Sequence, residues 1–198
     1  MTTIQDDSVQ DLTLLLATRL RVEREARGWS IADLATRSGV SRAMISKVER
    51  GEASPTAALL GRLAAAFGLT LSTLLARAEH DATRGGRVAR QAEQKLWRDP
   101  ASGYLRRAVT PPGAALELIQ VELPPKAKVA YPAATYVDWE HTIWVLEGHL
   151  RFHEGPARHD LDAGDCLALG QPQDCAFENM TDNPCIYLVA LARRQPPR

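Results

Sequence analysis

The 198-residue sequence has few cysteines, few aromatic residues and no long apolar run. Its longest uninterrupted apolar stretches, such as 14–17 and 64–67, are far shorter than the roughly 18 to 20 residues that span a bilayer, which excludes an integral membrane protein. The first eleven residues hold three aspartates and no Lys or Arg, so they lack the positively charged start of a secretory signal. These absences predict a cytoplasmic protein.

The three cysteines, Cys166, Cys175 and Cys185, are an odd number and form no C-x-x-C pair. Neither a disulfide scaffold nor a zinc finger is therefore expected. Reduced thiols are consistent with the predicted cytoplasmic location.

The formal net charge is zero, but the charge is unevenly distributed. Residues 12–77 contain ten Arg or Lys against five acidic residues, whereas residues 100–198 contain nine against twelve. The basic excess suggests a polyanionic partner for the first part of the chain only, with a merely solvated surface as the alternative.

Hydrophobic periodicity divides the chain into two parts. Residues 12–77 are rich in Ala, Leu and Arg, and their apolar residues recur at spacings of three and four, which predicts helices. Glycines followed by N-cap residues separate five short helices, at about 12–27, 30–37, 41–50, 56–67 and 71–77.

The second part is predicted to be all-β. Short β-rich runs separated by Pro, Gly and Asp turns occur at 115–123, 142–146, 149–153, 166–169 and 185–191. Their close spacing favours a sandwich or small barrel, since closure removes exposed edges. The predicted organisation is a helical domain over 1–77, a polar linker over 78–98 that leads toward a strand near 90–97, and a β domain over 99–198.

Residues 30–51 have the details of two helices joined at a tight turn. Ser30 and Asp33 stand at capping-box spacing, Gly39 can adopt a positive φ, and Ser41 can cap the second helix. The apolar positions expected in the core are Ile31, Leu34, Val40, Ile45 and Val48. The second helix then exposes its outer face with its N-terminal end leading, as a recognition helix in a DNA major groove requires.

Arg42 and Lys47 are predicted to read base edges, because both can donate to O6 and N7 of guanine. Ser46 and Arg50 are predicted to contact phosphate, which positions a protein without reading sequence. The predicted DNA-binding residues are Ser30, Arg37, Ser41, Arg42, Ala43, Ser46, Lys47 and Arg50. The arginines of the first helix, Arg19, Arg21, Arg24 and Arg27, are expected to be mostly solvated surface. The alternatives are a helical bundle with a solvated basic face and a helix-turn-helix used for protein contacts.

The segment of about 12–75 resembles the helix-turn-helix of the phage-repressor, or XRE, family, including Glu49-Arg50-Gly51 and Pro55 after the recognition helix. The resemblance implies a five-helix, lambda-repressor-like domain that binds double-stranded DNA. Two such modules in a homodimer would read a palindromic operator.

Three segments of the β-rich part, 140–152, 161–169 and 174–179, resemble the two sequence motifs of the cupin family. The resemblance spans about 103–192 and implies a double-stranded β-helix, or jelly-roll barrel. A repressor-type DNA-binding domain followed by a cupin is a known combination among bacterial regulators.

A metal-binding cupin of this type carries His-x-His and then Glu in its first motif, and one His in its second. In this chain Thr135 and Val137 stand in the His-x-His places, His141 in the Glu place and Cys175 in the place of the second-motif His. Valine cannot coordinate a metal and threonine rarely does, so the usual site is absent.

Three interpretations of His141 and Cys175 stay open. They could share zinc with Glu140 or an effector as third ligand, they could line a pocket in which Cys175 only packs, or His141 could lower the pKa of a reactive Cys175. The predicted effector pocket consists of Tyr131, Thr135, Val137, His141, Cys175 and Phe177. The aromatic residues could equally be core, and strand alternation turns Trp144 outward, as a candidate dimer contact.

The sequence thus predicts a transcriptional regulator whose cupin domain dimerises and binds a small effector, amino-acid-like or sulfur-containing by analogy with similar regulators. No catalytic residue and no certain cofactor are expected, with zinc as the alternative. The other hypotheses are a metal-dependent oxygenase or isomerase fused to a DNA-binding domain, and a cupin that only dimerises.

Overall fold

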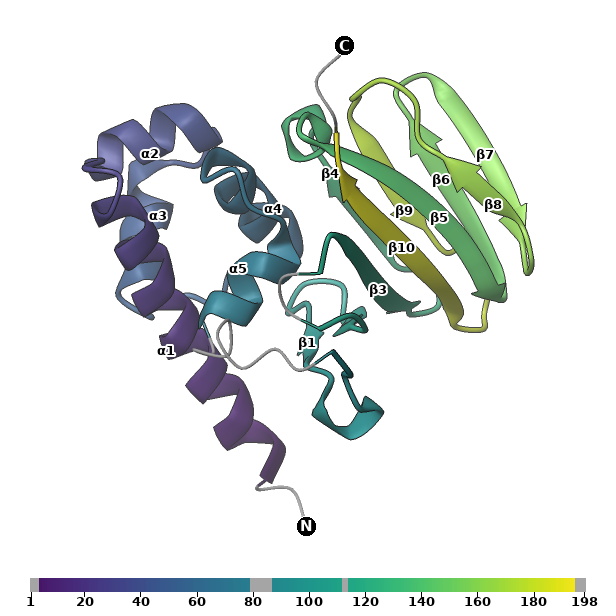
Figure 1. The fold of residues 1–198 in the computed structure, drawn as a ribbon, viewed down its shortest axis with the longest axis horizontal. Coiled ribbons are helices and arrows are strands. Elements are labelled where there is room, and N and C mark those ends of the chain that lie inside the picture. The colour runs from purple at the N-terminus through teal and green to yellow at the C-terminus, as the bar shows by residue number, and fades with distance from the viewer. Residues whose placement is uncertain (1–3, 79–86, 112–113, 195–198) are drawn as a thin grey trace. The chain divides into compact units, whose positions relative to one another are not determined.

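The structure, a computed structural model, describes residues 4–78, 87–111 and 114–194, with side chains from residue 13 onward. The chain forms two compact units, Met1–Arg84 and Gly85–Arg198. The first is helical and the second is built of strands (Figure 1). The division between them falls within the predicted linker of residues 78–98.

The helical unit contains the five helices expected from the sequence. They are α1 (Ile4–Glu25), α2 (Ile31–Ser38), α3 (Arg42–Glu49), α4 (Ala57–Ala66) and α5 (Leu71–Ala78). Four of them begin and end within about two residues of the prediction, whereas α1 begins eight residues earlier.

Local hydrogen bonds fix the turn between α2 and α3. Ser30 and Asp33 form the predicted capping box, in which Oγ of Ser30 accepts from the Asp33 amide and the Asp33 carboxylate accepts from the Ser30 amide. Gly39 ends α2 with a φ of +67°, and the Ser41 side chain accepts from the Met44 amide at 3.2 Å. The orientation of α3 relative to α2 is therefore set by residues close in sequence.

All five helices contribute buried residues to the core of the helical unit. Leu34, Val40, Ile45 and Val48 are buried as predicted, and Ile31 is half-buried. Among the described residues no single helix is long and apolar enough to cross a membrane. The α4–α5 pair has that length and composition only when taken together across a bend of 92°.

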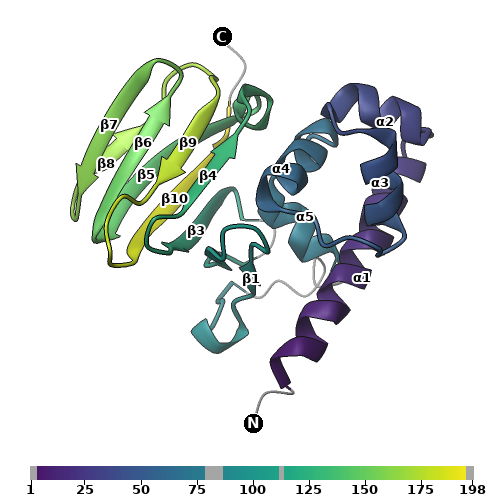
Figure 2. The ribbon, with the colours of Figure 1, turned by 180° about the vertical axis from the view of Figure 1, so that it is seen from behind.

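The β unit consists of two antiparallel sheets. The six-stranded sheet has the order β1 (Leu96–Arg98), β2 (Leu105–Ala108), β3 (Leu116–Leu123), β10 (Cys185–Arg193), β5 (Trp139–Glu147), β8 (Cys166–Ala168). The four-stranded sheet has the order β4 (Lys128–Tyr131), β9 (Cys175–Glu178), β6 (His149–Glu154), β7 (Ala157–Asp162). The two sheets face each other, as the opposite view shows (Figure 2), and form the jelly-roll arrangement expected from the sequence.

Two short helical turns accompany the strands, η2 (Gln91–Glu93) and η3 (Ala133–Tyr136). Strand β1 lies within the segment predicted as a linker, and pairs with β2 from Leu96 opposite Arg107 to Arg98 opposite Leu105. The Trp97 side chain is buried. Residues 96–98 therefore belong to the β unit.

Aromatic rings fill much of the space between the two sheets. The rings of Phe177 and Tyr187 stack with their centroids 5.4 Å apart, and Phe152 lies 4.8 Å from Phe177. The hydroxyl groups of Tyr104 and Tyr131 are 2.8 Å apart and form a hydrogen bond. At one end of the barrel interior, here called the open end, η3 lies beside a small cavity.

Candidate nucleic-acid interface and barrel cavity

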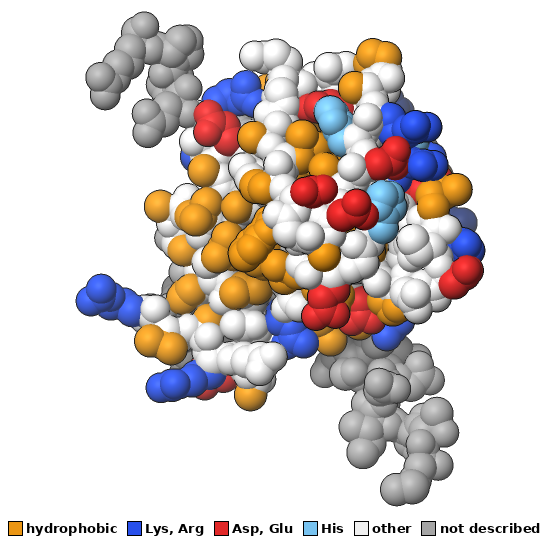
Figure 3. All heavy atoms as spheres, turned by 90° about the vertical axis from the view of Figure 1, so that its right-hand side faces the viewer, with side chains coloured by type: hydrophobic (Ala, Val, Ile, Leu, Met, Phe, Trp, Pro, Cys, Tyr) orange, Lys and Arg blue, Asp and Glu red, His pale blue; other side chains and the backbone are white. Residues whose placement is uncertain are grey.

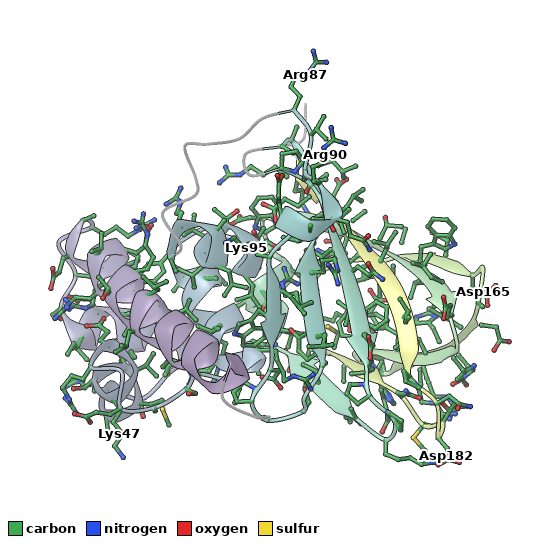
Figure 4. All side chains as sticks on the ribbon, turned by 90° about the horizontal axis from the view of Figure 1, so that it is seen from below. Lys47, Arg87, Arg90, Lys95, Asp165 and Asp182 are labelled. Carbon is green, nitrogen blue, oxygen red and sulfur yellow. The ribbon has the colours of Figure 1, made fainter. Side chains whose placement is uncertain are left out.

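Helix α3 has one buried side and one exposed side. Ile45 and Val48 are almost completely buried, whereas Arg42, Ala43 and Lys47 are exposed. Lys47 extends away from the helical unit (Figure 4). Among the other predicted DNA-binding residues on this face, Ser41 is exposed and serves as N-cap, and Ser46 is half-buried.

Arg50, at the end of α3, already has partners. Its Nε and Nη2 donate to the two carboxylate oxygens of Glu52 at 2.6 and 2.7 Å, and its Nη1 donates to Oγ of Ser46. The hydrogen bond from Arg50 holds the pKa of Glu52 below its usual value. Both side chains are about half exposed, so water and salt screen this ion pair. A phosphate could therefore replace Glu52 at little cost.

Ser30 and Arg37 have structural contacts of their own. Ser30 is held in its capping box, and the guanidinium carbon of Arg37 lies 4.4 Å above the ring of Trp29. A cation over an aromatic face is attracted by the ring's quadrupole. These contacts orient both residues at the ends of α2.

An ion pair links the last turn of α3 to α1. Nε and Nη2 of Arg24 donate to the two carboxylate oxygens of Glu49, both at 2.8 Å, and Nη1 donates to the Trp29 carbonyl oxygen at 2.9 Å. The two side chains are only 11% and 6% exposed. The expectation that Arg24 is solvated surface is thus wrong, because its partners are brought to it by the fold.

Glu23 forms a second buried ionic centre. Its carboxylate accepts from Arg19 on α1, from Arg27 in the turn after α1 and from Arg77 on α5 at distances of 2.6 to 3.0 Å. Burial alone would raise the pKa of Glu23, but the hydrogen bonds from Arg27, Arg77 and Arg19 outweigh it and lower the pKa to about 2. Arg19 and Arg27 are therefore also partners of a buried acid.

The open end of the barrel contains a small cavity. It measures about 10 Å³, which is room for roughly one water molecule. His141 and Cys175 line it, as do Tyr136, Glu154 and Arg194. The last three were not among the predicted pocket residues.

The other predicted pocket residues lie elsewhere. Tyr131 and Phe177 pack edge-to-face within the aromatic core, with ring centroids 6.1 Å apart. Thr135 has a buried hydroxyl, and Val137 is 53% exposed and does not line the cavity. The difference arises because residues 133–136 form the helical turn η3, so Tyr136 is buried between the less buried Thr135 and Val137.

His141 is a neutral imidazole near pH 7. Burial lowers its pKa to about 4, the hydrogen bond with the Trp139 carbonyl oxygen opposes this shift, and the charges of Arg106 and Arg194 lower the pKa further. Nδ1 lies 3.3 Å from that carbonyl oxygen. Since a carbonyl oxygen can only accept, Nδ1 carries the proton and Nε2 is an acceptor.

Cys175 is a protonated thiol. Burial raises its pKa to about 12, and its Sγ donates to the hydroxyl oxygen of Tyr136 at 2.8 Å. A reactive thiolate needs the opposite shift. The interpretation of Cys175 as a thiol activated by His141 is therefore wrong.

The cavity residues do not fit a zinc ion. The Tyr136 ring lies 4.5 Å from the His141 ring and the Tyr136 hydroxyl accepts from Cys175, while Glu140 is exposed on the other face of β5. Within residues 4–78, 87–111 and 114–194, no three His, Cys, Asp or Glu side chains gather as a metal site. A helix-turn-helix with an exposed basic second helix, joined to a jelly-roll unit, defines a DNA-binding protein with a second, β-barrel unit.

Comparison with known proteins agrees with this class. The model of the HTH_3 helix-turn-helix family matches residues 20–74. The chain is 40% identical over 67 residues to the HTH-type transcriptional regulator SutR of Escherichia coli, which covers 34% of this chain and 38% of SutR. It is 33% identical over 88 residues to the HTH-type transcriptional regulator DdrOP3 of Deinococcus deserti, which covers 44% of this chain and 68% of DdrOP3.

A solved structure shares the fold of both units. The HTH_3 family transcriptional regulator from Vibrio cholerae aligns with a TM-score of 0.75 at 22% identity, over 95% of this chain and 99% of that one. The chain belongs to the HTH_3, or XRE-type, family of helix-turn-helix transcriptional regulators. Its helical unit is the helix-turn-helix domain of that family, its β unit shares the fold of the Vibrio cholerae protein, and the chain spans little more than a third of the length of SutR.

Proposed function

We propose that this protein is a homodimeric regulator that reads a palindromic DNA operator and changes its DNA affinity when its cupin-like domain binds a small effector. The observation that carries the proposal is the two-sided character of α3. Ile45 and Val48 anchor the helix in the core, and Arg42 and Lys47 are left exposed on its outer face. This is the arrangement in which a recognition helix enters a major groove.

Arg42 and Lys47 are the proposed base-reading residues. Arg42 is the first residue of α3, so it lies at the end that leads into the groove, and Lys47 follows about 1.4 turns later. Both can donate to guanine, and a specific contact of this kind is worth about 1–3 kcal/mol of discrimination. Ser41, Ser46 and Arg50 are the proposed phosphate contacts.

The outer face of the six-stranded sheet supports dimerisation. Trp144 on β5 is 48% exposed, it pairs with Leu188 on β10, and Leu116 on β3 is 47% exposed. Hydrophobic side chains gather on this side of the β unit (Figure 3). The outer face of the four-stranded sheet is charged instead, with Arg151–Asp160 at 2.7 Å and His153–Glu178 at 2.6 Å.

We propose that a second copy of the chain covers this apolar face. A recognition helix of eight residues contacts only one half-site, and a dimer doubles the contacts. The effector is proposed to bind at the open end of the barrel, beside His141 and Cys175. The curated relatives are named as transcriptional regulators, and we propose that this chain likewise has no enzymatic activity.

The DNA-binding proposal is tested by selecting ligands for the full chain from a random duplex pool, then measuring affinity by fluorescence anisotropy. Replacing Arg42 and Lys47 together with Ala is expected to weaken binding to the selected duplex at least about 30-fold. The matched control is Arg21→Ala, at an exposed arginine of α1, which should leave the affinity within about twofold. Unchanged binding by the double variant at physiological salt would contradict the assignment of α3.

A further inference from the structure

Of the buried polar side-chain atoms without a hydrogen-bond partner, one belongs to a residue that lines the cavity, Arg194. Within the part of the chain that the structure describes, these atoms are Oγ1 of Thr135, Nε2 of His159 and Nε of Arg194. Arg194 lines the cavity, Thr135 precedes the cavity residue Tyr136, and His159 lies 3.4 Å from Oε2 of Glu154, which also lines the cavity. Such atoms are rare in native proteins and mark places where a missing partner belongs.

The cavity has opposite charges at two of its walls. The Arg194 guanidinium lies close enough to His141 to lower the pKa of that imidazole. Glu154 pairs with Cys175 across β6 and β9, and its charge helps to raise the thiol pKa. Among the described residues no ion pair joins the Glu154 carboxylate to Arg194.

The hydrogen-bonding capacity of the two walls is also complementary. Oε1 of Glu154 accepts from the Gly170 amide at 2.8 Å, and Oε2 lies 3.4 Å from Nε2 of His159. Nε2 of His141 is a second acceptor, since Nδ1 carries the proton. Arg194 supplies a cationic donor. The cavity thus offers a donor for an anionic group and two acceptors for a group that carries several protons.

We propose that this cavity binds a small zwitterion, an amino acid or close analogue, with its carboxylate on Arg194 and its ammonium group on Glu154 and His141. The inference rests on the proposed effector role of the cupin-like domain and names the chemical class of the effector. A carboxylate and an ammonium group in one small molecule match both walls at once.

The Tyr136 side chain occupies part of the proposed site. Its ring lies 4.5 Å from the His141 ring, and its hydroxyl accepts from Cys175. The remaining 10 Å³ cannot hold an amino acid, so the ring has to leave when the ligand enters. Tyr136 is the last residue of η3, which lies in the connection between β4 and β5. Ligand binding therefore moves this connection, and gives the barrel two conformations that a ligand can distinguish.

The test is calorimetric titration of the full-length protein with each proteinogenic L-amino acid. At least one is expected to bind, with a dissociation constant below about 1 mM, and to raise the thermal midpoint. For the best binder, the C-terminal amide removes the carboxylate and the N-acetyl derivative removes the ammonium group. Each is expected to bind at least about tenfold more weakly than the parent amino acid.

Two variants test which side chain binds the carboxylate of the ligand and which binds its ammonium group. Arg194→Met should weaken binding of the parent amino acid at least about tenfold but change binding of the amide little, since the amide lacks the group that Arg194 holds. Glu154→Gln should likewise weaken binding of the parent amino acid, but it should change binding of the N-acetyl derivative little, since that derivative lacks the ammonium group. The control is Arg193→Met, because Arg193 lies over the Trp139 ring 5.5 Å away and is exposed.

Tyr136→Ala should open the site and tighten binding, and Tyr136→Phe, which keeps the ring, should bind like the wild type.

If no amino acid binds to the wild type or to either Tyr136 variant, the proposal that the cavity binds a zwitterion is wrong. Equal binding of the parent, its amide and its N-acetyl derivative would also overturn it. If a different metabolite changes operator affinity instead, the effector role stands and only the ligand class fails. If an amino acid binds but operator affinity is unchanged, the site stands and the regulatory role fails.

Discussion

Arg24 and Glu49 are joined by two parallel hydrogen bonds of 2.8 Å, although 25 residues separate them in the chain. The pair connects α1 to the last residue of the proposed recognition helix. Paired guanidinium and carboxylate groups hold a fixed mutual geometry, because both are planar and bond at two points. The orientation of α3 relative to the helical core thus depends on a contact that does not itself face DNA.

Breaking this pair is expected to destabilise the helical unit. Arg24→Gln or Glu49→Gln leaves the other charge buried and should lower the free energy of unfolding by about 3 kcal/mol. The double variant should lose clearly less than the sum of the two single losses. Urea unfolding followed by helical circular dichroism measures these values. Arg21→Gln is the control, and a similar loss in that variant would show that the pair has no special role.

Stability should fall in acid because of Glu23. Its folded-state pKa, about 2, lies below the ordinary value of 4.5, so the unfolded chain binds the proton first. The stabilisation is complete above about pH 4.5 and is lost as the pH falls toward 2, amounting to on the order of 3 kcal/mol. Urea unfolding of the full chain across this range measures the loss.

Two variants separate Glu23 from other acids. Glu23→Gln should be less stable at neutral pH, since three arginines lose their partner, and its stability should change less between pH 4.5 and 2. Glu25→Gln, at a mostly exposed neighbour, should keep the wild-type pH profile. A Glu23→Gln profile parallel to that of the wild type is the result that rejects this explanation.

The thiols should differ sharply in reactivity. Cys166 is exposed, whereas burial raises the pKa of Cys175 to about 12 and that of Cys185 to about 11. Ellman's reagent should therefore release one equivalent of chromophore quickly from the native protein, and the rest only after unfolding. Cys166→Ser should remove the fast phase. A fast phase that persists in this variant would mean that a barrel thiol is accessible.

The proposed dimer should depend on Trp144. Trp144→Glu places a charge on the apolar face of the six-stranded sheet and should weaken self-association at least about tenfold in sedimentation equilibrium. Met180→Glu is a matched control, because Met180 is equally exposed, at 48%, but lies outside the strands. Loss of the dimer in both variants, or in neither, speaks against this face as the interface.

The helical unit could be predicted closely because its signals are local. The capping box of Ser30 and Asp33, the positive φ of Gly39 and the cap at Ser41 all act within four residues. The ion pair of Arg24 with Glu49 could not be predicted in this way, since nothing near either residue indicates the partner.

The barrel was predicted less completely. Apolar residues recur clearly along the long strands β3, β5 and β10. Strand β7, with the sequence Ala-Arg-His-Asp-Leu-Asp, is mostly polar and gives no such signal. The predicted pocket residues Thr135 and Val137 came from counting motif positions back along the chain. The helical turn η3 interrupts that count, because it puts Tyr136 inside the barrel and Val137 outside. Glu154 could have been found by alternation, because it follows the buried Leu150 and Phe152 on one face of β6.

Strand β10 comes after all other described strands in the chain, yet it lies between β3 and β5 and pairs with both along most of its length. During synthesis on the ribosome, the six-stranded sheet therefore cannot close until residue 193 has emerged. The helical unit has all its described helices within residues 4–78 and can fold while the barrel is still being made. A nascent chain thus holds a finished DNA-reading unit while the edges of β3 and β5 are unpaired and open to strands of other chains.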